Sequence, residues 1–587
     1  MKRVESAILK RHLLPPTLAL QSLLAVVRLF DAFHVKYYAT IHRAVTNKTF
    51  SLGFDLTPAL LPLSSITVVY LLMRKRYRDL LISISISVGL YLLFGLEASA
   101  ASLSILLTTS TLLSSGWLQD YVFWALALLT GFEGAALLHW VLLPLGIASP
   151  LAWFADLELH LYYINATLAP IITILTLCMW LLKPLAKRCL GTVGNFIILR
   201  LKLDAEFERE EIRLNHRALL VLSVVVAAVG ALYPYNPNIN PESIQIGVDI
   251  RHYVNTTVSV EKDPSSAFTV WGGSRPMIML TIYAFKHIFG LEVLEAVTYL
   301  PIILYPLLSL SVYFMVSQAS GDDEWAGLAA LFTAFGFKVT VGMYSYFLTN
   351  LLALALIFFG LGFLFKDLRK GNSTFPVVAS VLTSLAIFTH PWTFTQFYIP
   401  LALLGFVLGY MYLKGERSGF FTILVFLIVT GLVDLLKGVL MGGLEGFGAL
   451  TSTAPYILRI DYFWKNNIFT FRYLYGGLLS NTILLGIAAV GVYTLNHRKP
   501  YQFFQISLLS TSSIYYFISH IMYRERPYNN IPSRILYNLP FGLLTGLVII
   551  SLIRNSNLKR RVRIATSIFI AVYMTVYLLR SLANLIY

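Results

Sequence analysis

Blocks of about twenty consecutive apolar residues recur along most of the chain, and this repeat limits the fold more than any other feature. A block of this length is typical of an α-helix that crosses the roughly 30 Å hydrocarbon core of a bilayer. Backbone polar groups have no water partners inside lipid, so spanning segments form helices or closed barrels. A barrel needs alternating strands of about ten residues, whereas blocks such as 293–317 and 419–440 are continuously apolar. The sequence therefore predicts an all-α polytopic membrane protein.

The composition agrees with this class and argues against others. Hydrophobic residues make up 57% of the 587 positions and charged residues only 13%, whereas soluble domains carry about 25% charged residues. The net charge of +16 comes from Lys and Arg in short loops between apolar blocks, where the positive-inside rule places them. We therefore expect contact with membrane lipids and no nucleic-acid partner. The two cysteines show neither a disulfide nor a metal-ligand pattern.

The first six apolar blocks predict an N-terminal bundle within residues 1–182. Basic segments follow the second and sixth blocks, "MRKRYR" (73–78) and "KPLAKR" (183–188), and both fall on the cytoplasmic side if the N-terminus is inside. No catalytic motif is present in this bundle, so we expect an accessory or partner-binding role. Residues 183–216 mix acids and bases at helical spacing and predict a cytoplasmic interfacial connector.

Residues 217–587 predict a second module of about eleven spans, for about seventeen in the whole chain. Its topology depends on whether 274–290 crosses the membrane. If that segment lies flat on the outer surface, four basic segments fall inside; if it crosses, all four fall outside. These segments are "FKDLRK" (365–370), "LKGERS" (413–418), "NHRK" (496–499) and "RNSNLKRRVR" (554–563). The positive-inside rule thus favours an interfacial helix at 274–290 and places the polar loop 235–275 outside.

Four segments of this module resemble the GT-C class of membrane glycosyltransferases. The first outer loop contains an acid, Asp249 in "IQIGVDIRHYV", and "GGSRPMIMLTIYAFKHIFG" is similar to the short surface helix that follows the acid in this class. "FTHPWTF" (388–394) resembles a His-Pro pair of a middle span, and "IPSRILYNLP" (531–540) is similar to a late outer segment whose Arg binds the lipid phosphate. The resemblance implies a GT-C-like helical bundle with outer-face interfacial helices.

The resemblance also implies the reaction. It predicts that a sugar passes from a polyprenyl-phosphate carrier to a hydroxyl acceptor on the extracytoplasmic face, with inversion, and that Asp249 is the base. The expected substrate-binding residues are Arg251, His252, Arg275, His390, Arg524, Arg526 and Arg534.

The sequence also departs from better-known branches of the class. Asp249 is followed by Ile250 and not by the Glu of the protein O-mannosyltransferase and aminoarabinose transferase branches. The Trp-Trp-Asp-Tyr-Gly motif of oligosaccharyltransferases is absent from the sequence, which argues against en bloc transfer to Asn and leaves the acceptor open: a lipid-linked glycan, a lipid or a protein.

The residue types suit this chemistry on physical grounds. Transfer needs a base for the acceptor proton and positive charge for the departing phosphate, and the planar Arg side chain binds two phosphate oxygens at once. No metal-ligand spacing is present, so we expect a metal-independent reaction without a cofactor. Each residue also has a simpler interpretation: Asp249 as a solvated loop acid, Arg534 as an anchor at the membrane surface, and His390 as a polar cap at a helix end.

Two other functions are compatible with the sequence. A transporter or flippase of lipid-linked sugars would use the charges of Asp434 and Lys437 inside an apolar block, since charges within a membrane are costly and often functional. Such proteins commonly contain internal repeats, and 217–587 shows no convincing one. A non-catalytic membrane scaffold would leave the charges of the outer loops dispensable.

Overall fold

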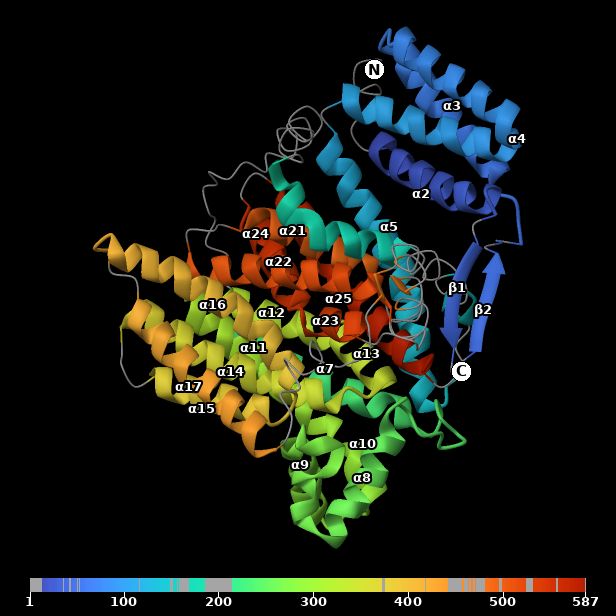
Figure 1. Ribbon diagram of the computed structural model, residues 1–587. Coiled ribbons are helices and arrows are strands. Elements are labelled where there is room, and N and C mark those ends of the chain that lie inside the picture. Colours follow the sequence, from blue (N-terminus) through green and yellow to red (C-terminus); the bar gives the residue numbers. More distant parts are fainter. Residues whose placement is uncertain are drawn as a thin grey trace.

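The chain is described by a computed structural model over residues 13–147, 151–184, 214–441 and 481–585, with gaps of one to ten residues inside these ranges, and over a few residues of 457–470. Within this part the fold is all-α, as predicted, apart from two short antiparallel strand pairs. Figure 1 shows one of these pairs beside the helical bundle. The predicted connector at 183–216 lies almost wholly outside the described residues.

The N-terminal part consists of three helices around a small core of their own and of two further helices beside the main bundle. Its elements are α2 (Leu14–Ala32), β1 (Lys36–Ile41), β2 (Ala44–Thr49), α3 (Thr57–Met73), α4 (Tyr77–Ser114), α5 (Leu118–Leu142), the 3₁₀ turn η2 (Leu143–Leu145) and a helix at Leu168–Pro184. Helices α2, α3 and α4 bury Leu18, Leu71 and Leu107 against one another, and α2 also packs against α5, where the hydroxyls of Ser22 and Tyr121 lie 2.7 Å apart.

Helix α4 is two helices that fold back on each other at Gly95. Gly95 has a φ of +84°, which an L-residue with a side chain rarely adopts. The hydroxyl of Ser99 donates to the backbone carbonyl of Ser87 at 2.8 Å, whereas twelve residues of continuous helix would span about 18 Å. The chain therefore reverses at Gly95, near the end of the apolar block 79–97, and the next block at 101–116 runs back along it.

The main bundle is built from residues 214–585. Its elements are α7 (His216–Leu232), η3 (Tyr233–Tyr235), α8 (Ile250–Lys262), η4 (Pro264–Phe268), η5 (Val270–Gly273), α9 (Pro276–Phe289), α10 (Val293–Tyr299), α11 (Pro301–Ser320), α12 (Asp323–Phe335), α13 (Phe337–Ser345), α14 (Leu348–Lys370), α15 (Phe375–Ile387), α16 (Pro391–Leu413), α17 (Phe420–Leu440), β3 (Ile457–Leu458), α21 (Thr482–Thr494), α22 (Pro500–Ile521), β4 (Met522–Tyr523), α23 (Ile531–Asn538), α24 (Phe541–Ile553) and α25 (Arg560–Ala583).

Nine helices of the described residues are long and apolar enough to cross a membrane, and six further apolar helices have 10–17 residues. The chain is therefore a polytopic helical membrane protein, and the total of about seventeen spans stays a prediction. The candidate span Asp323–Ser345 is bent, because α12 ends at Phe335 and α13 begins at Phe337. The bend requires Gly336, where a Cβ would lie 2.7 Å from the carbonyl oxygen of Phe332.

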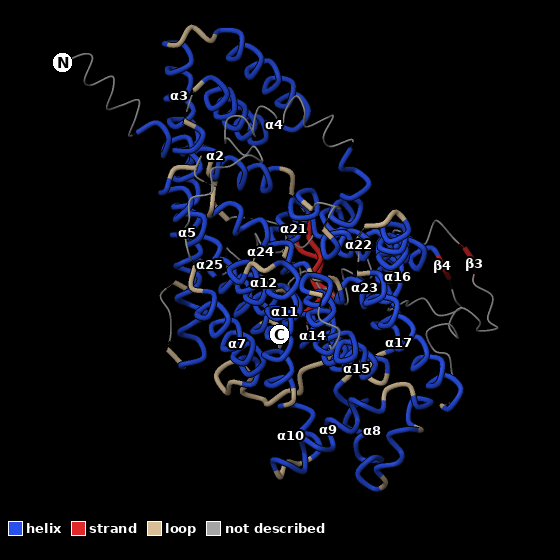
Figure 2. The backbone as a smooth tube through the Cα atoms, turned by 90° about the vertical axis from the view of Figure 1, so that its left-hand side faces the viewer, coloured by secondary structure: helices blue, strands red, loops and turns tan. Residues whose placement is uncertain are grey.

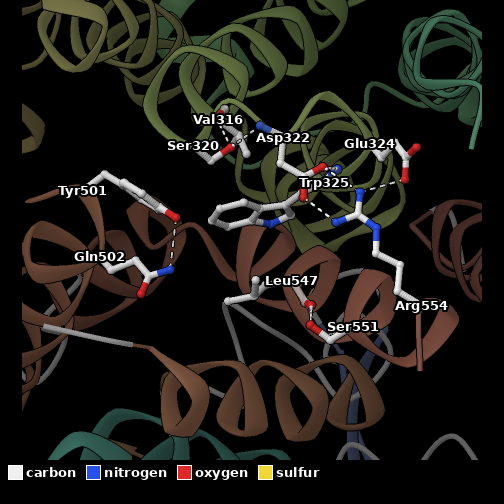
Figure 3. A network of polar contacts seen from close by, with 10 residues as sticks. All are labelled: Val316, Ser320, Asp322, Glu324, Trp325, Tyr501, Gln502, Leu547, Ser551 and Arg554. Carbon is white, nitrogen blue, oxygen red and sulfur yellow. Dashed lines mark hydrogen bonds and ion pairs between the residues drawn. The ribbon is translucent and has the colours of Figure 1, made fainter. Parts of the chain in front are cut away.

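Acidic and basic side chains gather at one end of the bundle. Arg554, which follows α24, donates to Asp322 at 2.6 Å and to Glu324 at 2.7 Å at the start of α12 (Figure 3). Asp322 also caps α12 by accepting from the backbone N–H of Trp325 at 3.0 Å. The guanidinium of Arg369 lies against Gly321. The basic segments 365–370 and 554–563 therefore meet at this end.

The opposite end carries a cap of short helices. Helices α8, α9 and α10 pack against one another beyond the ends of the long helices (Figures 1 and 2). Tyr346, directly after α13, donates from its hydroxyl to the carbonyl of Val297 in α10 at 2.6 Å. Helices α8, α9 and α10 therefore lie together at this end of the bundle, and the flat position of 274–290 on a membrane surface stays a prediction. That this end faces the outside of a membrane stays a prediction.

Helix α5 lies along α25 and connects the N-terminal part to the main bundle (Figure 2). Asp120 at the start of α5 pairs with Lys559 at 2.5 Å and with Arg561. At its other end, the carbonyl of Trp140 accepts from the hydroxyl of Tyr233 at 2.8 Å. The N-terminal residues thus contact the main bundle along the whole of α5, and the division at 182 and 216 stays a prediction.

Candidate active site

The loop that leads to Asp249 is held by side-chain and backbone hydrogen bonds. Asn240 accepts from the N–H of Ile244 at 2.8 Å and donates to the carbonyl of the same residue at 2.9 Å. Gly247 has a φ of +112°, and a Cβ there would lie 2.3 Å from the ring of Tyr346. Only glycine therefore fits this position. The backbone N–H of Val248 then donates to the carbonyl of Tyr344 at 2.9 Å. The end of α13 therefore helps to position Asp249, the residue that follows Val248.

Asp249 stands at the N-terminus of α8, where its carbonyl accepts from the backbone N–H groups of His252 and Tyr253. Its carboxylate makes no capping hydrogen bond to α8, so it is available for other chemistry. Burial raises the pKa of the Asp249 carboxyl, and the positive charges of Arg534, His252 and Arg275 partly offset that rise. The acid therefore lies in a setting that favours proton uptake and is surrounded by cations.

Arg275 approaches Asp249 from the start of α9. The first turn of this helix begins at Pro276, a position that suits proline because its missing N–H would have no partner there. The guanidinium of Arg275 lies over the ring of Trp271, 5.6 Å from its centre. Its Nε is buried and has no hydrogen-bond partner among the described residues. A buried unpaired donor is costly, so Arg275 is poised to bind an acceptor group.

Arg534 lies on the short helix α23 and is also close to the Asp249 carboxylate. Its guanidinium lies over the ring of Phe347, 5.7 Å from its centre, and its Nε is also buried without a partner within the described part of the chain. Burial lowers the pKa of Arg534, the charge of Arg275 lowers it further, and Asp249 opposes this. Two guanidinium groups close enough to repel each other thus face one carboxylate.

His390 is the N-cap of α16, and its contacts fix its tautomer. Its Nδ1 accepts from the backbone N–H of Thr393 at 3.1 Å and lies 2.8 Å from the hydroxyl of the same residue. That hydroxyl already accepts from the amides of Asn350 and Asn538, each at 3.1 Å, so its own proton points to Nδ1. A neutral ring whose Nδ1 accepts carries its proton on Nε2.

The Nε2–H of His390 is a buried donor without a partner in the described residues. Burial lowers the pKa of His390 well below its ordinary value, and the nearby charges of Arg275, Arg534 and Lys437 act in the same direction. The ring therefore stays neutral and offers one hydrogen-bond donor. The sequence-based interpretation of His390 as a polar helix cap is compatible with this geometry, because the cap uses Nδ1 alone.

A buried network of hydrogen-bonded amide side chains joins the segments that carry Arg534 and His390. Asn538 donates to Gln396 at 2.8 Å, and Gln396 donates to the hydroxyl of Ser512 at 2.9 Å and to the carbonyl of Ile535 at 3.1 Å. Together with the bonds to Thr393, this network joins α14, α16, α22 and α23. Satisfied buried networks of this kind hold one arrangement of the helices, so the positions of His390 and Arg534 are coupled.

A pocket of about 250 Å³ opens between α16, α22 and α23. His390 and Arg534 stand in its wall beside Trp392, Ile399, Tyr515 and Ile535, and most of the lining surface is apolar. The pocket therefore combines a mainly apolar wall with the two donors of its lining, His390 Nε2 and Arg534 Nε, that have no partner in the described residues. This combination suits a ligand with an anionic group joined to a hydrocarbon chain.

The structure brings five of the eight predicted site residues together: Asp249, His252, Arg275, His390 and Arg534. Arg251 is exposed on the first turn of α8, and no contact with the cluster is shown for it. Arg524 and Arg526 lie outside the described residues. No group of three His, Cys, Asp or Glu side chains able to hold a metal is present in the described part of the chain, and the metal-independent reaction stays a prediction.

Sequence reasoning did not identify the residues that support the cluster. Thr393, Asn350 and Asn538 lie within or beside apolar helices, and their only signal is a polar side chain in an apolar block. Lys437 gave a stronger signal, as a charge in such a block, but was grouped with Asp434. In the structure its ammonium donates to two backbone carbonyls beside the cluster.

Comparisons with known proteins find a distant likeness among solved structures. No family model matches the sequence, and no curated protein matches it. Among solved structures, the chain is similar to the Archaeoglobus fulgidus oligosaccharyltransferase, crystallised with a tethered acceptor peptide that contains the NVT sequon. The identity is 16%, the TM-score is 0.40, and the match covers 63% of this chain and 55% of that protein. The chain thus spans little more than half of that protein's length, and a likeness at this level does not identify its activity.

Proposed function

We propose that this protein is a membrane glycosyltransferase that takes a sugar from a polyprenyl-phosphate carrier and passes it to a hydroxyl acceptor on the extracytoplasmic face. The observation that carries the proposal is the cluster itself. One carboxylate, Asp249, lies among Arg275, Arg534 and His390, each with a buried donor that has no partner in the described residues. The cluster borders a mainly apolar pocket.

The charges of the cluster fit the charge that develops in such a reaction. A phosphodiester donor carries one negative charge, and the departing polyprenyl phosphate carries up to two. Arg275 and Arg534 supply two positive charges, and Asp249 supplies one negative charge. Donors that are in place before the reaction stabilise charge where it develops, because no reorganisation is needed at that moment. The cationic excess therefore favours the transition state over the bound donor.

The bond changes balance with these residues alone. The bond between the anomeric carbon and the phosphate oxygen breaks, and its electron pair leaves with the phosphate. A new bond forms between the same carbon and the acceptor oxygen, and Asp249 takes the acceptor proton. Attack from the side opposite the phosphate gives inversion. Burial favours this proton uptake, because it raises the pKa of the Asp249 carboxyl.

The distribution of basic residues supports the choice of face. Arg369, Arg554 and Arg561 lie at the end of the bundle opposite the cluster. Basic segments prefer the cytoplasmic side, so the cluster would face outward. The acceptor is a hydroxyl of a lipid-linked glycan, a lipid or a protein.

A purified-protein assay tests the proposal. The full chain in lipid nanodiscs is given a synthetic polyprenyl-phosphate hexose and lipid-linked glycans extracted from membranes. We expect release of polyprenyl phosphate together with a transferred sugar of inverted anomeric configuration. Movement of intact donor across reconstituted vesicles without bond cleavage would instead support the transporter, and neither activity would support the scaffold.

His390 allows a sharper prediction, because its two nitrogens have separate tasks. Asn at this position keeps an acceptor for the N–H of Thr393 but has no donor at the place of Nε2, whereas Gln reaches that place with an amide N–H. A hydrogen bond to a charged group contributes about 1.5–3 kcal/mol, so we expect His390→Asn to lower kcat/KM by about tenfold to a hundredfold. His390→Gln should keep more activity while lowering the melting temperature more. Equal activity of the two variants would show that Nε2 donates to nothing in the reaction.

A further inference from the structure

Lys437 is a buried cation near the end of α17 that the proposed reaction does not use. Only 6% of its surface is exposed, and it lies in a mainly apolar helix whose one other charged residue is Asp434. Its Nζ donates to the carbonyl of Ser274 and to the carbonyl of Ile387, both at 2.8 Å. Its ammonium also lies over the ring of Phe388, 5.6 Å from its centre. One side chain thus contacts two segments far apart in the sequence.

Both carbonyls belong to segments that present site residues. Ser274 directly precedes Arg275 at the start of α9, and Ile387 is the last residue of α15, three positions before His390. The carbonyl of Ile387 lies in the last turn of α15 and has no partner within that helix, and the carbonyl of Ser274 precedes α9 and lies outside its hydrogen-bond ladder, so both depend on another donor. A third bond joins the same segments, because the N–H of Met277 donates to the carbonyl of Phe388 at 3.2 Å.

We propose that Lys437 is a positioning residue that fixes the separation between Arg275 and His390 around the phosphate of the donor. The inference rests on the proposed function, since it assigns the two segments to one phosphate site. Lys437 touches neither substrate nor reacting atoms in this account. It acts through the two backbone segments, and its charge additionally disfavours protonation of the His390 ring.

This role accounts for a buried ammonium in a mainly apolar helix, where Asp434 is the one other charged residue. Burying an ammonium is costly unless it is hydrogen-bonded, and here two carbonyls supply those bonds. A displacement of about 1 Å at a site can cost about a hundredfold in rate. The placement of Arg275 and His390 by Lys437 is therefore expected to affect the rate of transfer strongly.

The test compares Lys437→Met, which keeps the chain length but loses the donors, with Lys437→Arg, which keeps donors and charge. Lys414→Met, which removes an exposed ammonium directly after α16, is the matched control. We expect Lys437→Met to lower kcat/KM for the polyprenyl-phosphate hexose by about tenfold to a hundredfold, Lys437→Arg to recover part of the loss, and the control to stay within about threefold. If Lys437→Met does not fold, Lys437→Gln replaces it, with a shorter amide donor.

A second readout separates positioning from simple destabilisation. The groups that face Asp249 are His252 on α8, Arg275 on α9 and Arg534 on α23. If Lys437→Met lets Arg275 move away, the acidic limb of the pH–rate profile shifts to higher pH. Wild-type kinetics with an unmoved limb in Lys437→Met would overturn the inference while an inactive Asp249→Asn still supports the proposed function. Full activity of Asp249→Asn would instead overturn the proposed function itself.

Discussion

Replacing Asp249 by Asn is expected to lower kcat for sugar transfer by about 10²–10⁴-fold, the contribution typical of a positioned general base. The amide cannot take the acceptor proton, but it has nearly the same shape as the carboxylate. Fold and donor binding should persist, because the Asp249 carboxylate makes no capping hydrogen bond to α8. Steady-state kinetics with a polyprenyl-phosphate hexose measure the change, and the loss should fall on kcat more than on KM.

Glu242→Gln is the matched control for this variant. Glu242 lies seven residues earlier in the same loop and is exposed, so its loss should leave kcat within about twofold. A melting temperature close to that of the wild type would show that both variants are folded. Wild-type turnover in Asp249→Asn, or an equal loss in Glu242→Gln, would contradict the assignment of the base.

Replacing Arg534 by Gln is expected to lower kcat/KM by about 10²–10³-fold, as the removal of one preorganised donor at a developing charge does in other enzymes. The guanidinium stands in the wall of the pocket and next to Asp249. Its Nε lacks a partner among the described residues, so a bound phosphate gains a donor that no other described group uses. The same change should weaken inhibition by free polyprenyl phosphate.

Two further variants give this prediction its controls. Arg534→Lys keeps the charge but loses the planar fork, so its activity should lie between wild type and Arg534→Gln. Arg251→Gln removes an exposed arginine of α8 and should change kcat/KM by no more than about threefold. If Arg251→Gln had the larger effect, the phosphate would bind on the outer side of α8 and not at the pocket.

Much of the fold could be predicted from hydrophobic blocks and charge alone. The basic segment that contains Arg369 and the one that begins at Arg554 lie together at one end of the bundle, whereas the reversal at Gly95 falls inside an apolar block and had no signal in the block pattern. Helix length follows from the thickness of the bilayer, and the side on which basic loops lie follows from the positive-inside rule. The bend at Gly336 could not be predicted, because a single glycine within an apolar block gives no sign of how close the neighbouring backbone comes.

The candidate site could be predicted in its parts but not in its assembly. Asp249, Arg275, His390 and Arg534 each stand next to an apolar block at what the charge pattern predicts to be the outer end. Their mutual arrangement depends on Tyr346, Thr393 and Lys437, whose contacts join segments more than forty residues apart. Such contacts have no sequence period, so single-sequence patterns do not report them. Their roles in transfer stay predictions.

The pH dependence of kcat/KM tests the central claim most directly, namely that Asp249 acts as a base among cations. Burial raises the pKa of this carboxyl above its ordinary value of 3.8, and only the deprotonated form accepts a proton. Activity should therefore be present above this pKa and fall as the pH drops through it. Because Arg534 holds the pKa down, the account predicts that the acidic limb moves to higher pH in Arg534→Gln. An acidic limb that stays in place in Arg534→Gln, or that persists in Asp249→Asn, would contradict it.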